Sequence, residues 1–287
     1  MAEIIDGKAV SAKVRAQIKT DSEEFEKSTG IKPGLAVIIV GEDPASKIYV
    51  RNKAKACEEV GFYSEVYELP EDTTERALLD LVHSLNHNNL IHGILVQSPL
   101  PKHLDEALIV NNISPEKDVD AFHPENVGRI MIGEYSFLPC TPAGIMELMD
   151  QYKIGISGKD CVVIGRSNIV GKPMAMLLLH ANGTVTVCHS KTADLAQHTK
   201  RADIVVVAVG KPKFLKGDMI KEGAVVIDVG MDRDENGKLC GDADFESCAQ
   251  KASYITPVPG GVGPMTITML MKNTLTAARM HAKKHNI

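Results

Sequence analysis

The stretch that decides the fold runs Val162-Val163-Ile164-Gly165-Arg166-Ser167-Asn168-Ile169-Val170-Gly171-Lys172-Pro173. A short apolar run ends at a glycine, a polar turn follows, and a helical pattern begins near Gly171. A strand, a glycine-containing turn and a helix in this order often hold a nucleotide phosphate, because the helix start offers free N–H groups and glycine admits the phosphate. The spacing is G-x-S-x-x-x-G instead of G-x-G-x-x-G, so an ordinary strand-to-helix turn is an equal alternative for this stretch alone.

The segments that follow favour the nucleotide-binding interpretation. Apolar patterns predict helices at 173–181 and 194–200, and strands at 184–188, 204–209 and 224–229. This β-α-β-α-β-β order, with nearly continuous apolar strands, is typical of a parallel sheet covered on both faces. The sequence therefore predicts an α/β domain with a mostly parallel, Rossmann-like sheet.

The end of the second strand bears on the choice of cofactor. An NAD site usually has Asp or Glu there, which binds the ribose hydroxyls. Here the residues are Cys188-His189-Ser190-Lys191, with no carboxylate, and Arg166 lies in the first turn. A hydroxyl and a guanidinium suit a 2′-phosphate, so these residues favour NADP as the cofactor, with NAD as the alternative.

Composition limits the class of protein. The chain has 287 residues, enough for one large domain or two ordinary ones. Its net charge of -5 argues against broad nucleic-acid binding. The six cysteines form no C-x-x-C pair, which indicates reduced thiols in a cytoplasmic protein and neither a disulfide framework nor a zinc site. No secretory signal and no apolar run of membrane-spanning length is found, so we expect no membrane contact.

The first half of the chain also alternates helices and strands. Periodicity predicts helices at 7–27, 47–60 (capped by Ser46), from Asp72 or Thr73 to Leu85, and 103–112, and strands at 35–40, 63–69 and 93–97. Tyr49 and Lys53 share one face of the second helix. From this helix alone, a solvated basic face is the more frequent explanation. Gln97 ends a buried strand, where open α/β sheets place ligands, although a Gln bonded to a neighbouring loop is equally common.

Two further segments stand out. The segment Pro139-Cys140-Thr141-Pro142 is typical of a crossing between domains, and Thr141 is expected to cap a helix through Tyr152. Near the end, the run 257–266 holds three glycines and three prolines, which indicates a loop whose backbone comes close to a ligand. A helix is expected from about Met265 to Lys283. Asp118 and Asp120 are too few ligands for a metal site, so no metal is expected.

Seven motifs occur together in order along the chain: Tyr49-x-x-x-Lys53, Val96-Gln97-x-Pro99-Leu100-Pro101, Lys117-Asp118-Val119-Asp120, Pro139-Cys140-Thr141-Pro142, Gly165-Arg166-Ser167-x-x-Val170-Gly171-x-Pro173, Cys188-His189-Ser190-Lys191-Thr192 and Pro257-Val258-Pro259-Gly260-Gly261-Val262-Gly263-Pro264-Met265-Thr266. The chain resembles the bifunctional methylenetetrahydrofolate dehydrogenase/methenyltetrahydrofolate cyclohydrolase family along essentially its whole length.

The resemblance implies two α/β domains around a cleft and a homodimer built through the nucleotide domains. The first domain would comprise residues 1–139, completed by the C-terminal helix 266–287, and would bind folate. The second would be the Rossmann-like NADP-binding domain at 140–265. The implied reactions are oxidation of 5,10-methylenetetrahydrofolate with NADP and hydrolysis of the product to 10-formyltetrahydrofolate.

The resemblance also implies roles for single residues. Lys53 would be central to the cyclohydrolase step, with Tyr49 near the reacting carbon, Gln97 orienting Lys53 and Asp120 anchoring the pterin. Further folate contacts would come from Val96, Ser98, Pro259, Gly260, Gly261, Val262, Gly263 and Pro264. NADP contacts would come from Gly165, Arg166, Ser167, Ser190 and Met231.

The chain departs from the family pattern at Ser98, where leucine is expected, and at Ala121, where glycine is expected. Neither change removes a reacting group. The alternatives are a folate dehydrogenase without cyclohydrolase activity, another two-domain NADP-dependent oxidoreductase such as a shikimate or amino-acid dehydrogenase, and a non-catalytic nucleotide-binding protein. Intact Tyr49, Lys53 and Gln97 speak against the first, and the 257–266 loop speaks against the second.

Overall fold

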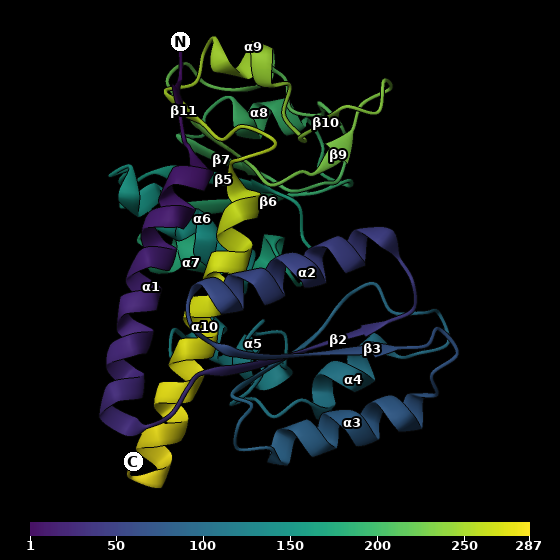
Figure 1. The fold of residues 1–287 in the computed structure, drawn as a ribbon. Helices are drawn as coiled ribbons and strands as arrows, with labels where there is room; N and C mark the ends of the chain where they lie inside the picture. The colour runs from purple at the N-terminus through teal and green to yellow at the C-terminus, as the bar shows by residue number, and fades with distance from the viewer. The chain divides into compact units, whose positions relative to one another are not determined.

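The chain forms two compact α/β units in the computed structural model, which describes residues 1–287 (Figure 1). The first unit comprises Met1–Ala12 and Thr141–Thr266, and the second comprises Lys13–Cys140 and Ile267–Ile287. The expected folate-binding domain included residues 1–12, whereas the structure assigns these residues to the first unit, together with 141–266. The reason is that strand β1 (Glu3–Ile4) pairs in parallel with β11 (Tyr254–Ile255).

The first unit contains a six-stranded sheet in the order β1-β11-β8-β7-β5-β6, and every pairing in it is parallel. Its main strands are β5 (Asp160–Ile164), β6 (Thr184–Cys188), β7 (Ile204–Val207) and β8 (Val225–Asp228). Residues of β5, β7 and β8 form the core of this unit, because a sheet covered on both faces needs apolar side chains on both. The α/β class and the mostly parallel sheet are thus confirmed.

Shorter elements complete the first unit. The helices are α6 (Cys140–Gln151), α7 (Gly171–His180), α8 (Leu195–Thr199), α9 (Phe245–Ala249) and the 3-10 turn η1 (Gly217–Met219). A hairpin joins β9 (Asp232–Arg233) and β10 (Leu239–Cys240). The strands β1, β9, β10 and β11 have two residues each and were not expected, since two residues show no periodicity.

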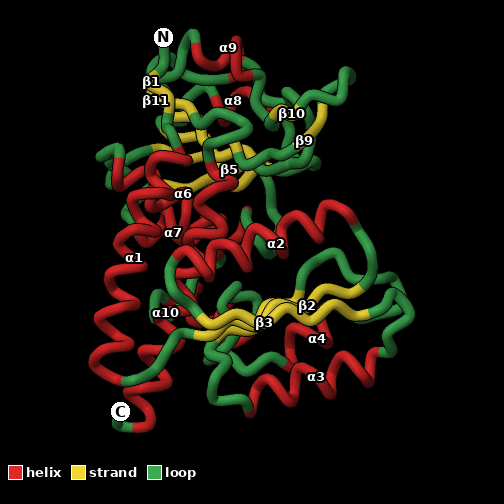
Figure 2. Tube along the Cα trace, in the orientation of Figure 1, coloured by secondary structure: helices red, strands yellow, loops and turns green.

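The second unit has a three-layer arrangement. Its parallel sheet has the order β3 (Tyr63–Leu69), β2 (Gly34–Val40), β4 (Gly93–Val96). Helix α2 (Pro44–Glu59) lies on one face, and α3 (Glu75–His87) and α4 (Glu106–Asn112) lie on the other (Figures 1 and 2). The central strand β2 is buried along its whole length, whereas the edge strand β3 has several exposed residues.

Three more helices are α1 (Gly7–Thr29), α5 (Pro124–Ile132) and α10 (Val262–His285). None of the helices is both long and apolar enough to span a membrane. Within the second unit, Asn273 of α10 is buried and its Nδ2 donates to Val119 O at 2.7 Å and to Leu138 O at 2.8 Å. This amide therefore ties α10 to the segment that carries Asp118 and Asp120.

Several expected helix starts were wrong. Helix α2 begins at Pro44, because proline suits the first helical turn, and Asp43 is the cap: its Oδ2 accepts the Ser46 N–H at 2.7 Å. Helix α3 is capped by Thr74 and not by Asp72 or Thr73. Helix α4 begins only after the Asp105 cap. Helix α6 starts at Cys140, so Thr141 lies inside it and its Oγ1 contacts Thr266 Oγ1 at 3.0 Å.

We predict that Asn273→Ala lowers the free energy of unfolding by about 2 kcal/mol or more, since a buried acceptor without a partner costs about 1 to 3 kcal/mol. Denaturant unfolding measures this value. Thr276→Ala on the same helix is the control: Thr276 Oγ1 bonds only the nearby Lys272 O, and the change should cost less than about 0.5 kcal/mol. Equal losses in both variants would contradict the role given to Asn273.

Candidate active site

A cavity of about 430 Å³ lies in the first unit, beyond the carboxyl ends of β5, β6 and β7. This is where open parallel sheets bind their ligands. Its lining residues are Ile164, Gly165, Arg166, His189, Ser190, Thr192, Leu195, Ala208, Val209, Lys211 and Phe214. The structure therefore brings together three of the residues expected at NADP, namely Gly165, Arg166 and Ser190.

The turn after β5 requires its glycine. Gly165 has φ +135°, and a Cβ there would lie 2.3 Å from Ala208 O. Ser167 Oγ accepts the N–H groups of Val170 at 3.1 Å and Gly171 at 3.3 Å, so this side chain shapes the start of α7. Ser167 is not among the lining residues of the cavity.

The lining of this cavity fits a dinucleotide with an additional phosphate. The side chains offer the cations of Arg166 and Lys211 and the hydroxyls of Ser190 and Thr192, and no carboxylate is among them. Sequence reasoning missed Lys211 and Thr192. Both could have been found from their positions in the chain. Lys211 directly follows Gly210, which comes after β7, and Thr192 lies two residues after Ser190.

Met231, also expected at NADP, does not line this cavity. It is 51% exposed, and its Cε lies 3.2 Å from the position that a Cβ on Gly263 would occupy. Met231 is therefore placed beside the 257–266 loop of the same unit.

A second constellation lies in the other unit, between α2 and the end of β4. Lys53 Nζ donates to Gln97 Oε1 at 2.8 Å. Gln97 Nε2 in turn donates to Ser98 O at 2.6 Å. The two bonds use the oxygen as acceptor and the nitrogen as donor, so they fix the amide in one orientation. Tyr49, one helical turn before Lys53, is 38% exposed.

Electrostatics of the Lys53 group are set by burial. Burial lowers the pKa of the Lys53 ammonium, while the nearby Asp120 carboxylate acts in the opposite direction. Burial also raises the pKa of Asp120, which the Lys53 charge partly offsets. The two groups therefore share one site in which neither charge is fully solvated.

Cys140 is a site residue whose role was not expected. Its Sγ donates to Asp120 Oδ1 at 3.5 Å and to Val119 O at 3.6 Å. Burial, together with Asp120, raises the pKa of this thiol well above its usual value. The group is thus a protonated donor that helps to place the Asp120 carboxylate.

The Asp120 segment has a rigid support. Asp118 is 2% exposed, and its carboxylate accepts the N–H groups of Phe122 and His123 and the Asn126 side-chain amide. Ala121, where the resemblance led us to expect glycine, is buried with φ +58°, a conformation that favours glycine. The alanine therefore adopts a backbone conformation in which glycine would be less strained.

The strand end beside Gln97 has two further expected contacts. Val96 is the half-buried last residue of β4. Ser98 is exposed, its peptide bond to Pro99 is cis, and its hydroxyl donates to the Glu106 carboxylate. The Ser98 side chain is therefore held toward α4, by a bond that a leucine could not make.

The loop 257–266 belongs to the first unit. Gly260 has φ +107°, and a Cβ on Gly261 would lie 2.5 Å from Pro257 O. The bond between Val258 and Pro259 is cis. Helix α10 already begins at Val262, so Val262, Gly263 and Pro264 form its first turn, and the expected start at Met265 was wrong.

A parallel sheet with a glycine turn and a phosphate-suited cavity, together with a half-buried lysine in a second α/β unit, defines a dinucleotide-dependent enzyme. A family model described as "Tetrahydrofolate dehydrogenase/cyclohydrolase, NAD(P)-binding domain" matches residues 139–282, and one described as "Tetrahydrofolate dehydrogenase/cyclohydrolase, catalytic domain" matches residues 5–120. The chain belongs to the tetrahydrofolate dehydrogenase/cyclohydrolase family.

Individual relatives agree over nearly the whole chain. "Bifunctional protein FolD" of Acetivibrio thermocellus is 61% identical over 282 residues, which cover 98% of this chain and 99% of the relative. The crystal structure of FolD from Campylobacter jejuni has a TM-score of 0.95 and 54% identity, and covers 98% of this chain and 99% of that one. The Trypanosoma brucei FolD, complexed with NADP cofactor and inhibitor, has a TM-score of 0.93 and 43% identity, and covers 97% of this chain and 98% of that one.

Proposed function

We infer that this chain is a bifunctional enzyme of one-carbon folate chemistry. It oxidises 5,10-methylenetetrahydrofolate to 5,10-methenyltetrahydrofolate with NADP and then hydrolyses the product to 10-formyltetrahydrofolate. The observation that carries the second activity is the bond from Lys53 Nζ to Gln97 Oε1 at 2.8 Å, made by a lysine whose pKa burial lowers. Family membership removes the other two-domain oxidoreductases as alternatives.

The dehydrogenase step depends mainly on positioning. NADP, when bound, supplies the hydride acceptor. Gly165 lets the cofactor approach the backbone, and Arg166 and Ser190 bind the 2′-phosphate, with Lys211 and Thr192 beside them in the same cavity. Ser167 shapes the turn, and Met231 contributes from its place beside Gly263. No acid or base is required, because the folate product carries a delocalised cation of its own.

The cyclohydrolase step needs a group that handles the proton of the attacking water. A lysine does so near neutral pH only when its pKa is lowered, and Lys53 meets this condition through burial. Gln97 orients the amine. Tyr49 lies one helical turn from Lys53 on α2, and in this proposal it packs beside the reacting folate carbon. Asp120 anchors the pterin. The methenyl cation would lower the lysine pKa further.

The remaining folate contacts come from backbone-rich segments. On the strand side they are made by Val96 and Ser98. The loop contributes Pro259, Gly260, Gly261, Val262, Gly263 and Pro264, where positive φ and absent side chains expose the backbone.

A dehydrogenase without cyclohydrolase activity is the nearest alternative. An enzyme with the dehydrogenase activity alone would not need the Lys53 amine to be oriented by the Gln97 side-chain amide. The two bonds that fix Gln97 and the thiol that places Asp120 therefore favour the bifunctional enzyme.

We predict that Lys53→Met lowers the cyclohydrolase kcat by about 100-fold or more, since positioned proton transfer contributes about 100- to 10,000-fold. NADPH formation should persist while methenyltetrahydrofolate accumulates, as absorbance shows. In the unchanged protein, ring opening should accelerate as pH rises through the lowered lysine pKa, because only the neutral amine accepts a proton. Lys55→Met, an exposed change on the same helix, is the control. Ring opening at a near-normal rate in Lys53→Met would exclude this role.

We predict that Arg166→Ala raises KM for NADP by about 10- to 100-fold and leaves KM for NAD nearly unchanged, because a hydrogen bond to a charged group contributes about 1.5 to 3 kcal/mol. Initial rates with both cofactors measure this ratio. Lys159→Ala, an exposed change before β5, is the control for loss of positive charge. Equal increases of KM for NADP and NAD would show that Arg166 does not bind the 2′-phosphate.

We further propose a cytoplasmic homodimer formed through the first unit. Strand β6 is at the edge of the six-stranded sheet, and its Val187 is 39% exposed, so an unpaired edge with an apolar side chain is available. All six cysteines are free thiols, which suits a reducing compartment. Light scattering should give twice the chain mass of 31.1 kDa, and Val187→Lys should shift it toward the monomer. A monomer at micromolar concentration, or detection of the protein outside the cytoplasmic fraction, would contradict the proposal.

A further inference from the structure

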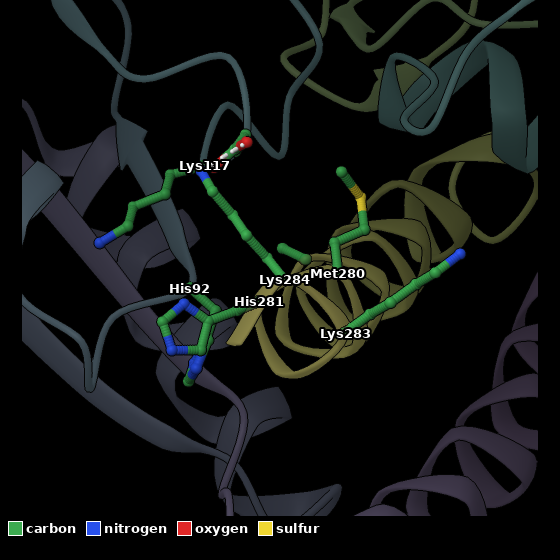
Figure 3. Close-up of a pocket in the computed structure, with 8 residues that line it drawn as sticks. His92, Lys117, Met280, His281, Lys283 and Lys284 are labelled. Carbon is green, nitrogen blue, oxygen red and sulfur yellow. Dashed lines mark hydrogen bonds and ion pairs between the residues drawn. The ribbon is translucent and has the colours of Figure 1, made fainter. Parts of the chain in front are cut away.

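A cavity of about 530 Å³ in the second unit has a basic lining whose groups do not converge (Figure 3). Lys117 and Lys283 line it, but their ammonium groups point to opposite sides. Lys117 Nζ already donates to two backbone carbonyls, Leu85 O at 2.9 Å and Asn88 O at 2.8 Å. The Nε2 of His92 is buried and has no hydrogen-bond partner, so it offers no accessible donor.

Hydrogen-bond donors do converge in the first unit, in the turn that follows β7. The consecutive backbone N–H groups of Val209, Gly210 and Lys211 all donate to the side chain of Asp242. The first two donate to Oδ2 at 2.6 Å and 3.2 Å, and the third donates to Oδ1 at 2.6 Å. Both oxygens of one carboxylate are thus used by a single turn.

This turn forms part of the wall of the cavity that we assign to NADP. Val209 and Lys211 line that cavity, as do Ala208 before them and Phe214 after them. Lys211 Nζ lies 5.8 Å from the centre of the Phe214 ring. The place of the Lys211 cation in the cavity therefore depends on a backbone segment that Asp242 holds.

The backbone of Asp242 is fixed in turn by a second buried carboxylate. Asp228 ends β8, the strand beside β7, and is 3% exposed. Its carboxylate accepts the N–H groups of Asp242 at 2.9 Å and Ala243 at 2.8 Å. Gly241 leaves room for this contact, since a Cβ there would lie 1.9 Å from Asp228 Oδ2. The wall of the cavity is thus connected through Asp242 to the end of β8.

A buried carboxylate that binds backbone N–H groups has an ordinary structural explanation, because buried donors need acceptors. Asp203 is an example at the other end of β7. It directly precedes this strand, and its Oδ2 accepts the Asp160 N–H at 3.0 Å. Neither Asp203 nor Asp160 lines the cavity. Asp242 differs from Asp203 because the N–H groups that it binds belong to the cavity wall.

We propose that Asp242 is a positioning residue for the cofactor: it holds the turn of Val209, Gly210 and Lys211 in the conformation that binds NADP. Asp242 is fully buried and does not line the cavity, so it acts through the turn. When the turn is released, NADP must order it on binding, and this ordering lowers the affinity. The inference rests on the NADP site proposed above and extends it.

The test measures KM and Kd for NADP in the whole protein, by initial rates with methylenetetrahydrofolate and by calorimetric titration. Asp242→Ala removes the acceptor of all three hydrogen bonds and should raise both values about 30-fold or more. Asp242→Asn keeps one oxygen acceptor and the same shape, so the increase should be only about 3- to 10-fold. At saturating NADP, kcat should change by less than about twofold in Asp242→Asn.

Asp203→Asn is the matched control, since it makes the same change at the opposite end of β7. It should change KM for NADP by less than about twofold. Loss of folded protein alone would lower the apparent kcat and leave KM unchanged, so the KM values separate positioning from stability. If Asp242→Ala fails to fold, the two asparagine variants still decide. Equal KM for NADP in Asp242→Asn and Asp203→Asn would overturn the proposal.

The Arg166→Ala variant separates this proposal from the cofactor site on which it rests. Weaker NADP binding in both Arg166→Ala and Asp242→Asn would support the role of Asp242. Weaker binding in Arg166→Ala alone would leave the cofactor site in place and exclude that role. Unchanged NADP binding in both variants would overturn the assignment of the cavity to NADP as well.

Discussion

The cyclohydrolase chemistry proposed for this enzyme depends on one constraint, which is the placement of the Lys53 ammonium where burial disfavours its charge. A lysine in such a place needs a fixed acceptor, and Gln97 provides it at 2.8 Å. Asp120 supplies the opposite charge nearby, and its own burial raises its pKa. Burial lowers the pKa of Lys53 and the Asp120 charge raises it, so this pKa depends on how firmly Gln97 and Asp120 are held in place.

The surroundings of this group act as its support. Asp118 accepts three hydrogen bonds and fixes the backbone at Phe122 and His123, while Asn273 of α10 binds Val119 O. We assign neither Asp118 nor Asn273 a direct part in the reaction. They define where Asp120 can be, and a small displacement there would change the field at Lys53, because electrostatic interactions in buried places are only weakly screened.

The nucleotide half was largely predictable from the residues alone. Its main strands are nearly continuous apolar runs, since both sheet faces are covered, and the glycine turn after Ile164 predicts the phosphate site that we propose. The two-residue strands could not be predicted, because they have no pattern of their own. The start of α2 was misjudged because both Asp43 and Ser46 can cap a helix, and only the structure shows that the Asp43 carboxylate accepts the N–H of Ser46.

The sequence by itself determined the α/β class, the glycine-dependent turns and, through the order of its motifs, the family and the expected Lys53 site. These features are local: they depend on backbone freedom at single residues and on side-chain periodicity. The tertiary structure alone decided the Lys53–Gln97 bond, the thiol of Cys140 at Asp120 and the unmatched nitrogen of His92. The first two join segments far apart in the chain, and the desolvation that gives all three their chemistry exists only after the units have packed.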